Sequence, residues 1–457
     1  MQESKKGLKG EITVFLTLIS VVLISFIIAI LDSAVIKTYG NTKKADAEAA
    51  VFSLFGEYED ELFNDYNILA VDSSYGKKGD KEKYIEDKLR YFGTVSMDHS
   101  IEGIQLLTDE NAAAFRSQAL KYITGVSAKK DIHKFDSEKT KWTDIYNNGL
   151  KAHEKDCEFD TLLKDLKNKL SGESSGDENA FEILEDSKNS SFLEQLLPDE
   201  SEVSNRKINL NEMVSKRNIK KGYGLTYNTG SIYGGLKDIA FNEYILSTYS
   251  YMGNEKAENP GLLYEAEYII GGMDSDKANL EKVAKDIIYM RLIPNYNALI
   301  KMPGKMAEVK TLSTTLAVLL KNPALKEPVE NLLKWLFAYT ESKCDTKALM
   351  AGVNIPEIKT ADTWQCGLYD CFTNNVTYNL SSDEHGLSYK DFLRILLFKT
   401  DNKKATLRAV DMTEINIAAL RKTFKADNCF VKIKLSNKAE LLKGFSYSFP
   451  ITFGYVE

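Results

Sequence analysis

The sequence predicts an α+β membrane protein in which one long N-terminal transmembrane helix continues into a mostly helical ectodomain with a small antiparallel sheet. Three features predict this class: an uncharged run near the start, helical spacing of apolar residues through the middle, and alternating apolar residues at the C-terminus. The 457 residues are 43% apolar and 27% charged, so the chain beyond the anchor can bury an ordinary core.

The run from Ile12 to Leu31 contains twenty consecutive uncharged residues. A helix of that length spans about 30 Å, the thickness of the hydrocarbon core of a bilayer. A cleavable signal peptide has a shorter apolar region and small residues at its cleavage site, where this chain has Asp32. We therefore expect an uncleaved anchor, whose membrane positions include Ile12, Phe15, Leu16, Leu23, Phe26 and Leu31.

The orientation of the anchor is predicted from the lengths of its flanks, because similar numbers of lysines stand on both sides of it. Residues 1–10 form a short basic leader, whereas more than four hundred residues follow the anchor. A first helix beside a short basic start usually keeps its N-terminus in the cytoplasm. We expect a single-pass protein of the cell membrane with a cytoplasmic N-terminus and an extracellular C-terminal domain.

Four hydroxyl side chains interrupt the anchor, and they leave two interpretations open. Such hydroxyls can bond to the carbonyl of the preceding turn, as in a solitary anchor. Small and hydroxyl residues also permit close approach to other helices inside the membrane. The four are Thr13, Thr17, Ser20 and Ser25.

Residues 11–66 are predicted to form the transmembrane helix together with an amphipathic extension. Apolar residues recur in this extension at spacings of three to four, the helical period. If Gly40 is tolerated at its usual cost of about 1 kcal/mol, one helix of about 80 Å runs from Ile12 to near Asp65. The residues expected to dock this helix to the outer domain are Val51, Phe55, Tyr58 and Leu62.

The ectodomain is predicted in two parts joined by a linker. Residues 67–170 mix strand-like runs ("NILAVD", "SIEGIQLL") with helical ones, which predicts a first α+β part. Residues 171–205 are rich in Ser, Glu and Asp, as expected of a flexible acidic linker. Residues 206–457 are helix-rich, and "CFVKIKLS" and "FSYSFPITFGYVE" alternate as the strands of a C-terminal β-hairpin do.

Charge and cysteine content exclude several classes of protein. The net charge of −7 argues against a nucleic-acid partner, which would require a basic face. Five cysteines are too few and too scattered for a disulfide framework. Cys366 and Cys371 could close one small ring worth about 2 kcal/mol, but their spacing matches neither a redox pair nor a zinc pair.

No motif with catalytic or metal-binding spacing stands out, so we expect no enzyme activity, cofactor or metal. The four histidines lack zinc-site spacing, and no nucleophile elbow, P-loop or dinucleotide glycine triplet is present. The segment after Asp72 lacks the second serine of an adhesive metal-binding loop. Glu265 and Glu267 would lie about 7 Å apart on one face of a predicted strand, where we expect solvated or lysine-paired carboxylates rather than an acid–base pair.

Several stretches of the chain resemble one family. They are "GEITVFLTLI…DSAVIK", "YEAEYIIGGMDSDKANLEKVAKDIIYMRLIPNYNAL", "WLFAYTESKCDTKALMAGVNIPEIKT", "LSSDEHGLSYKDFLRILLF" and "LRAVDMTEINI". They resemble a domain-of-unknown-function family of clostridial and related Gram-positive bacteria, which is typically encoded beside tight-adherence (Tad or Flp) pilus genes. This resemblance implies a place in that apparatus and names no reaction.

The first helix also resembles the starts of pilin-like proteins of that machinery, in which a basic leader ending in glycine precedes an apolar helix. The resemblance implies leader cleavage between Gly10 and Glu11. Such pilins usually carry glutamate at the fifth residue after the cut, where this chain has Phe15. A minor or accessory subunit therefore fits better than the major repeating subunit.

Together these observations predict a membrane-anchored, pilin-like or accessory structural component of a Tad-type pilus or secretion apparatus. Its partners would be the membrane and other pilin-like or Tad assembly proteins, and it could enter surface filaments. Two alternatives remain: an anchored extracellular enzyme or ligand-binding domain, and an adhesin at the pilus tip. The sequence assigns no small-molecule ligand.

Overall fold

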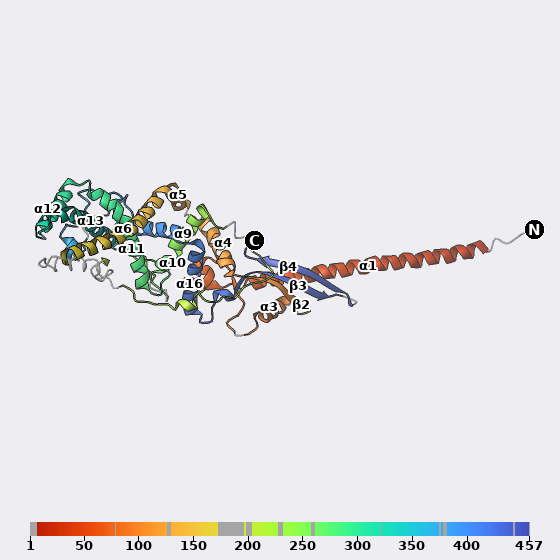
Figure 1. Ribbon diagram of the computed structural model, residues 1–457. Helices are drawn as coiled ribbons and strands as arrows, with labels where there is room; N and C mark the ends of the chain where they lie inside the picture. The colour runs from red at the N-terminus through yellow and green to blue at the C-terminus, as the bar shows by residue number, and fades with distance from the viewer. Residues whose placement is uncertain are drawn as a thin grey trace, which may run out of the picture.

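In a computed structural model, the chain forms a long helix that projects from an elongated body (Figure 1). The N-terminus lies at the far end of the helix, and the C-terminus lies beside the body. The structure describes residues 7–77, 79–125, 129–171, 196–197, 203–226, 232–256, 261–319, 321–373, 376–377, 382–441 and 444–456.

The projecting helix, α1 (Gly7–Phe55), contains 49 residues. The predicted single helix to Asp65 is wrong, because α1 ends at Phe55 and a separate short helix, α2 (Asp60–Tyr66), follows. Phe55 packs against the sheet and Leu62 packs in a different core. A straight helix cannot serve both cores, so the chain turns at Gly56, and α1 is about 74 Å long.

The four described strands are all antiparallel, as the sequence predicts, and β3 lies at the centre of their sheet. β2 (Met97–Leu106) pairs along one edge of β3 (Cys429–Glu440). β4 (Ser446–Gly454) pairs with the other edge and completes the C-terminal hairpin. β1 (Val71–Asp72) adds two residues beside the start of β3, so "NILAVD" forms a much shorter strand than its pattern indicates.

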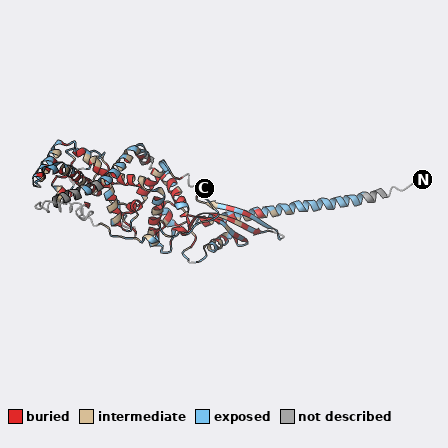
Figure 2. Ribbon diagram, viewed as in Figure 1, coloured by how far each residue is buried: buried red, intermediate tan, exposed pale blue. Residues whose placement is uncertain are grey.

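The C-terminal half of α1 lies along this sheet, and α3 (Lys81–Leu89) packs against both α1 and the sheet. The resulting membrane-side core contains residues of α1, α3 and all four strands. Figure 2 shows the position of this core on α1, where exposed residues of the helix give way to buried ones beside the sheet. The alternation of β3, with buried and partly exposed residues in turn along most of its length, provides the apolar face that α1 covers.

The rest of the body contains a main core and a distal core. Helices of the main core are α4 (Asp109–Gly125), α5 (Lys129–Ser137), α9 (Leu236–Thr248), α10 (Glu265–Gly271), α15 (Tyr389–Lys399) and α16 (Asn402–Leu420). Helices that reach the distal end are α6 (Lys139–Ser171), α11 (Asp276–Leu299), α12 (Pro303–Leu319), α13 (Lys326–Met350) and α14 (Asp370–Thr373). Of these, α11 and α13 contribute buried residues to both cores. This arrangement confirms the predicted α+β class with a long N-terminal apolar helix.

The two predicted parts of the ectodomain share both the sheet and the main core. β2 from the first part pairs with β3 from the second, and α4 packs against α9 and α16. Most of the predicted linker, residues 171–205, falls outside the described residues. Within it, Leu196 and Leu197 are buried in the main core.

Candidate functional site: the anchor and its junction with the ectodomain

The predicted membrane positions of α1 are all exposed in this chain. The exposed fraction of these side chains runs from 53% at Ile12 to 66% at Phe15, and the others are Leu16, Leu23, Phe26 and Leu31. Among the described residues, α1 is the one helix long and apolar enough to cross a membrane. An apolar surface of this length left without protein cover is typical of a helix that lies in lipid.

Two hydroxyl groups in the anchor bond to their own helix. Thr17 Oγ1 donates to the Val14 carbonyl at 2.9 Å, and Ser25 Oγ donates to the Val21 carbonyl at 2.8 Å. Neither group therefore needs a partner from another helix. Gly10 and Glu11 lie in the first turns of α1, and the predicted cleavage between them stays a prediction.

The four predicted docking residues are divided between two cores. Val51 and Phe55 are 1% and 3% exposed in the membrane-side core, whereas Leu62 is fully buried in the main core. Tyr58 lies between them and its ring contacts that of Phe63 at 5.4 Å. These residues thus join α1 and the segment after it to two cores of the body rather than to one surface.

Phe55 is the aromatic centre of this docking. Its ring lies edge-on to three rings of β3, β4 and the C-terminal tail at 4.9 to 5.4 Å: Phe430, Phe453 and Tyr455. The Tyr455 hydroxyl also donates to the Phe55 carbonyl, which caps the end of the helix. Phe52, nearly one turn earlier, is 68% exposed and contacts only the edge of this cluster, with its ring centroid 6.0 Å from that of Phe453.

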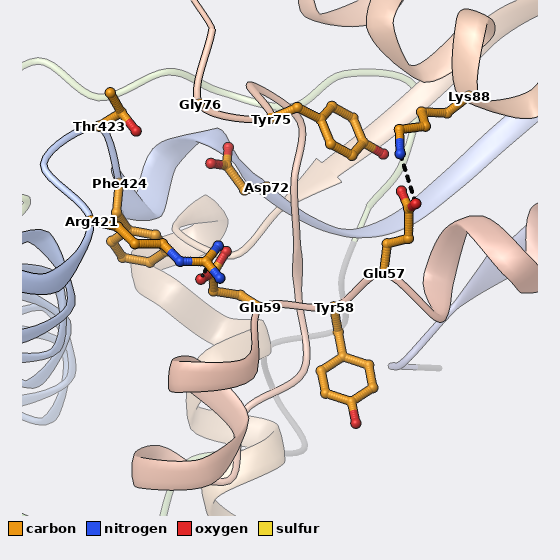
Figure 3. A pocket seen from close by; sticks show the side chains of 10 residues that line it. All are labelled: Glu57, Tyr58, Glu59, Asp72, Tyr75, Gly76, Lys88, Arg421, Thr423 and Phe424. Carbon is orange, nitrogen blue, oxygen red and sulfur yellow. Dashed lines mark hydrogen bonds and ion pairs between the residues drawn. The ribbon is translucent and has the colours of Figure 1, made fainter.

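A pocket of about 360 Å³ opens where α1 ends and the main body begins (Figure 3). Two ion pairs cross it: Glu57 Oε1 lies 2.7 Å from Lys88 Nζ, and Glu59 Oε1 lies 2.7 Å from Arg421 Nη1. The pairs join the segment after α1 to α3 on one side and to the residue after α16 on the other. The remaining lining residues are Tyr58, Asp72, Tyr75, Gly76, Thr423 and Phe424.

Burial raises the pKa of one carboxyl group in this pocket, that of Glu59. Desolvation, followed by the hydrogen bond to Glu61, raises the pKa of Glu59 to about 7, although Arg421 opposes the shift. The same hydrogen bond lowers the pKa of Glu61. The two carboxyl groups therefore hold one proton between them up to near-neutral pH. The charged groups of the pocket are matched with one another, as expected of a joint between two parts of a protein.

Asp72 is used within its own loop. One carboxylate oxygen accepts the Ser74 backbone N–H and the other accepts the Ser74 hydroxyl, both at 2.8 Å. These bonds form a local turn of the kind that aspartate favours.

The predicted strand at Glu265 and Glu267 is wrong, because both residues lie in helix α10 and are buried. The expectation of solvated carboxylates is wrong as well, because Glu265 and Glu267 are 1% and 0% exposed. Glu265 accepts hydrogen bonds from the Ser250 N–H at 2.9 Å and from Asn416 at 2.6 Å. A short segment buried on every side shows no helical period, which is why its pattern resembles a strand.

Glu267 accepts hydrogen bonds from the Met252 N–H at 3.0 Å and from the Tyr389 hydroxyl at 2.9 Å. Burial raises the pKa of both glutamates, and that of Glu267 reaches about 7. The two carboxyl groups point to different partners and together hold the segment after α9. Their geometry is that of structural groups rather than of an acid–base pair.

A buried ionic network in the distal core has no signal in the sequence pattern. Lys359 Nζ lies 2.6 Å from Glu341 and 2.7 Å from Asp345, and Arg291 Nε lies 2.9 Å from Asp345. All four side chains are at most 3% exposed. Charges on α13 look like those of a solvated helix face, so only the three-dimensional packing reveals their burial.

Three cysteines lie beside this network. Cys366 Sγ faces the Phe337 carbonyl and Cys371 Sγ faces the Leu336 carbonyl, so the two sulfurs point to different positions on α13. Both are free thiols here, and their disulfide stays a prediction. Cys344 Sγ, Cys366 Sγ and a Glu341 oxygen lie within 4.8 Å of one another. Glu341 is already engaged by Lys359 and by the Cys366 N–H, so this group is a poor metal site.

Comparison with known proteins gives one match: residues 171–441 match a family of unknown function, DUF5702. No curated protein and no solved structure matches the chain.

Proposed function

The chain belongs to DUF5702, a family of unknown function, and we propose from its own geometry that it is a membrane-anchored structural protein of a cell-surface apparatus. In this proposal α1 crosses the cell membrane once, with its N-terminus in the cytoplasm. The ectodomain lies outside the cell and packs against the C-terminal half of the same helix.

The observation that carries this proposal is the division of α1 into two halves of opposite character. Residues from Ile12 to Leu31 expose apolar side chains, whereas Ala47, Ala50 and Leu54 are almost fully buried. One continuous helix thus joins the membrane to the centre of a folded core. Such a connection transmits position and force between membrane and ectodomain without a flexible linker.

A structural role also agrees with the chemistry of the junction pocket. Its acids and bases are paired across the junction, Glu57 with Lys88 and Glu59 with Arg421. The buried glutamates of α10 are hydrogen-bonded to the protein itself. Each of these groups is bonded to other groups of the body that α1 carries.

The finer proposal is a minor or accessory component of a Tad-type pilus or secretion apparatus, in contact with other pilin-like or assembly proteins. It is supported by the resemblance of the first helix to pilin-like starts and by its Gly10–Glu11 step. The apolar Phe15 at the position of the usual glutamate favours an accessory role over the repeating subunit.

The test is the intact mass and N-terminal sequence of the native protein, taken separately from membranes and from sheared surface filaments. An uncleaved chain found in membranes supports a fixed accessory protein. A chain that begins at Glu11 and is recovered with filaments supports a processed subunit. A chain found in neither fraction, released into the medium after cleavage beyond Leu31, would contradict the proposal.

A further inference from the structure

We propose that the end of the β3–β4 hairpin is a second membrane contact, which binds phospholipid of the outer leaflet in a groove beside α1. The inference rests on the proposed anchoring by α1 and adds a site to it. The groove has a volume of about 830 Å³ and lies between α1 and the hairpin end. Its walls are Ala29, Asp32, Ser33, Ile36, Lys37, Gly40 and Asn41 on α1, and Leu441, Phe445 and Tyr447 on the hairpin.

The hairpin runs along α1 toward the membrane. Near the body, Phe453 contacts Phe55 at 4.9 Å. Farther along, Gly40 faces Tyr447 so closely that a Cβ there would lie 3.5 Å from the ring. From Phe453 to Tyr447 the strand covers about 20 Å, and from Phe55 to Gly40 the helix covers about 22 Å. Strand and helix therefore advance together, and β3 and β4 reach toward the projecting apolar half of α1 (Figure 1).

The level of the hairpin end matches the headgroup region. The polar layer on each side of the hydrocarbon core is about 5 to 8 Å thick, the rise of roughly four or five helical residues. If Ile12 to Leu31 fill the core, the residues from Asp32 to Ile36 lie in that layer. Asp32, Ser33 and Ile36 from this stretch line the groove, and Ala29 at its inner end lies within the hydrocarbon. Lys37, Gly40 and Asn41 line its outer end, beyond the polar layer.

The side chains at this level suit a lipid occupant. Phe445 is 55% exposed and lies two residues, about 7 Å, nearer to the membrane than Tyr447, close to the level of Ile36. Val35 on α1 is 52% exposed at the same level. Aromatic rings at such a depth are typical membrane-interface anchors. Lys37 on the groove wall lies about 9 Å beyond Leu31 along α1, and its long side chain can extend back to the depth of lipid phosphates, where an ammonium group is favoured. The apolar walls continue the lipid-exposed surface of α1, so acyl chains that cover the helix also reach the groove.

The consequence is a fixed height and tilt for the ectodomain. A single helix anchors a protein but leaves its tilt to its neighbours. A second contact on one side of α1 resists rotation of the body toward the membrane on that side.

The experiment uses the full-length protein in vesicles of phosphatidylcholine and phosphatidylglycerol, with lipids brominated either near the glycerol or near the chain ends. Bromine quenches tryptophan fluorescence on contact. The native tryptophans Trp142, Trp335 and Trp364 are at most 8% exposed, and wild-type protein supplies their background. Three variants each add one reporter: Phe445→Trp at the hairpin end, Val22→Trp in the middle of the span, and Tyr369→Trp at an exposed position of the distal body.

We expect lipids brominated near the glycerol to quench the Phe445→Trp signal about twofold, with weaker quenching by deep bromine. Val22→Trp should respond more strongly to deep bromine, and Tyr369→Trp should match wild type. If Val22→Trp is quenched while Phe445→Trp behaves like Tyr369→Trp, the lipid contact is wrong although the anchor stands; occupation of the groove by a second protein helix gives this result. If Val22→Trp is not quenched, both the anchor and the lipid contact are overturned.

Discussion

At the scale of single residues, the buried charges of the body are its most sensitive points. Glu267 is fully buried, and its second carboxylate oxygen has no hydrogen-bond partner among the described residues. Because burial raises its folded pKa to about 7, the folded state binds a proton that the unfolded state releases above its lower, ordinary pKa. This group therefore destabilises the fold progressively as pH rises from about 4.5 to 7.

Glu267→Gln tests this effect, since the amide imitates the protonated acid. We expect the variant to match wild type near pH 5 and to exceed it at pH 8 by up to roughly 3 kcal/mol of unfolding free energy. Denaturant unfolding of the purified protein in detergent at several pH values measures the difference. The control is Glu48→Gln, whose exposed side chain on α1 predicts a profile parallel to wild type. Equal pH profiles for Glu267→Gln and wild type would refute the assignment.

Lys359 is the centre of the distal ionic network. Its replacement by methionine leaves Glu341 and Asp345 buried without their shared cation. Loss of one partner of a buried pair typically costs about 3 to 5 kcal/mol. We expect Lys359→Met to lower the unfolding midpoint strongly, whereas Lys44→Met, which breaks an exposed pair with Glu48, should change stability by less than about 1 kcal/mol. Similar losses in the two variants would show that the network is not the source of the effect.

At the scale of elements, two phenylalanines on α1 provide a matched test of docking. Phe55 is 3% exposed and Phe52 is 68% exposed on the same helix. We expect Phe55→Asp to destabilise the ectodomain by more than about 3 kcal/mol, because it removes a core ring and buries a charge. Phe52→Asp should cost less than about 1 kcal/mol. Thermal unfolding followed by circular dichroism measures both, and an unchanged melting temperature for Phe55→Asp would contradict the docking.

Gly40 tests how the helix tolerates its close neighbour on the hairpin. A Cβ at this position would meet Tyr447 at 3.5 Å and Leu441 at 3.8 Å, which are ordinary van der Waals distances. Gly40→Ala should therefore stabilise α1 by about 0.5 to 1 kcal/mol through helix propensity. A lower melting temperature would mean that the hairpin packs more tightly against the helix than these distances indicate.

The sequence predicts those elements that have a strong period of their own. The apolar run of α1 and the alternation of the C-terminal hairpin specify themselves locally, and both are confirmed. The end of α1 is not local, because Phe55 and Leu62 share a helical spacing but pack in different cores. Glu265 and Glu267 were placed on a strand for a related reason, since the partners that bury them come from distant segments.

The candidate site was predicted in part. The membrane positions and the first two docking residues follow from hydropathy and spacing, and the structure exposes the former and buries the latter. The junction pocket joins residues near 57, 88 and 421, which no spacing rule connects. The ionic network around Lys359 depends in the same way on tertiary packing.

At the scale of the whole molecule, the central claim is that α1 crosses the membrane once and carries the body on its outer side. The N-terminal half of α1 is apolar and exposed, whereas residues of its C-terminal half are buried in the body. The short basic leader favours a cytoplasmic N-terminus. The proposed lipid contact of the hairpin depends on this arrangement.

The most direct measurement is thiol labelling of intact cells with a membrane-impermeant maleimide. Cys344, Cys366, Cys371 and Cys429 are buried, and wild-type protein gives the background labelling. The reporters are Gln2→Cys in the leader and Val95→Cys, at a position that is 78% exposed on the body. We expect labelling of Val95→Cys on intact cells and of Gln2→Cys only after permeabilisation. Labelling of Gln2→Cys on intact cells, with Val95→Cys protected until permeabilisation, would contradict it.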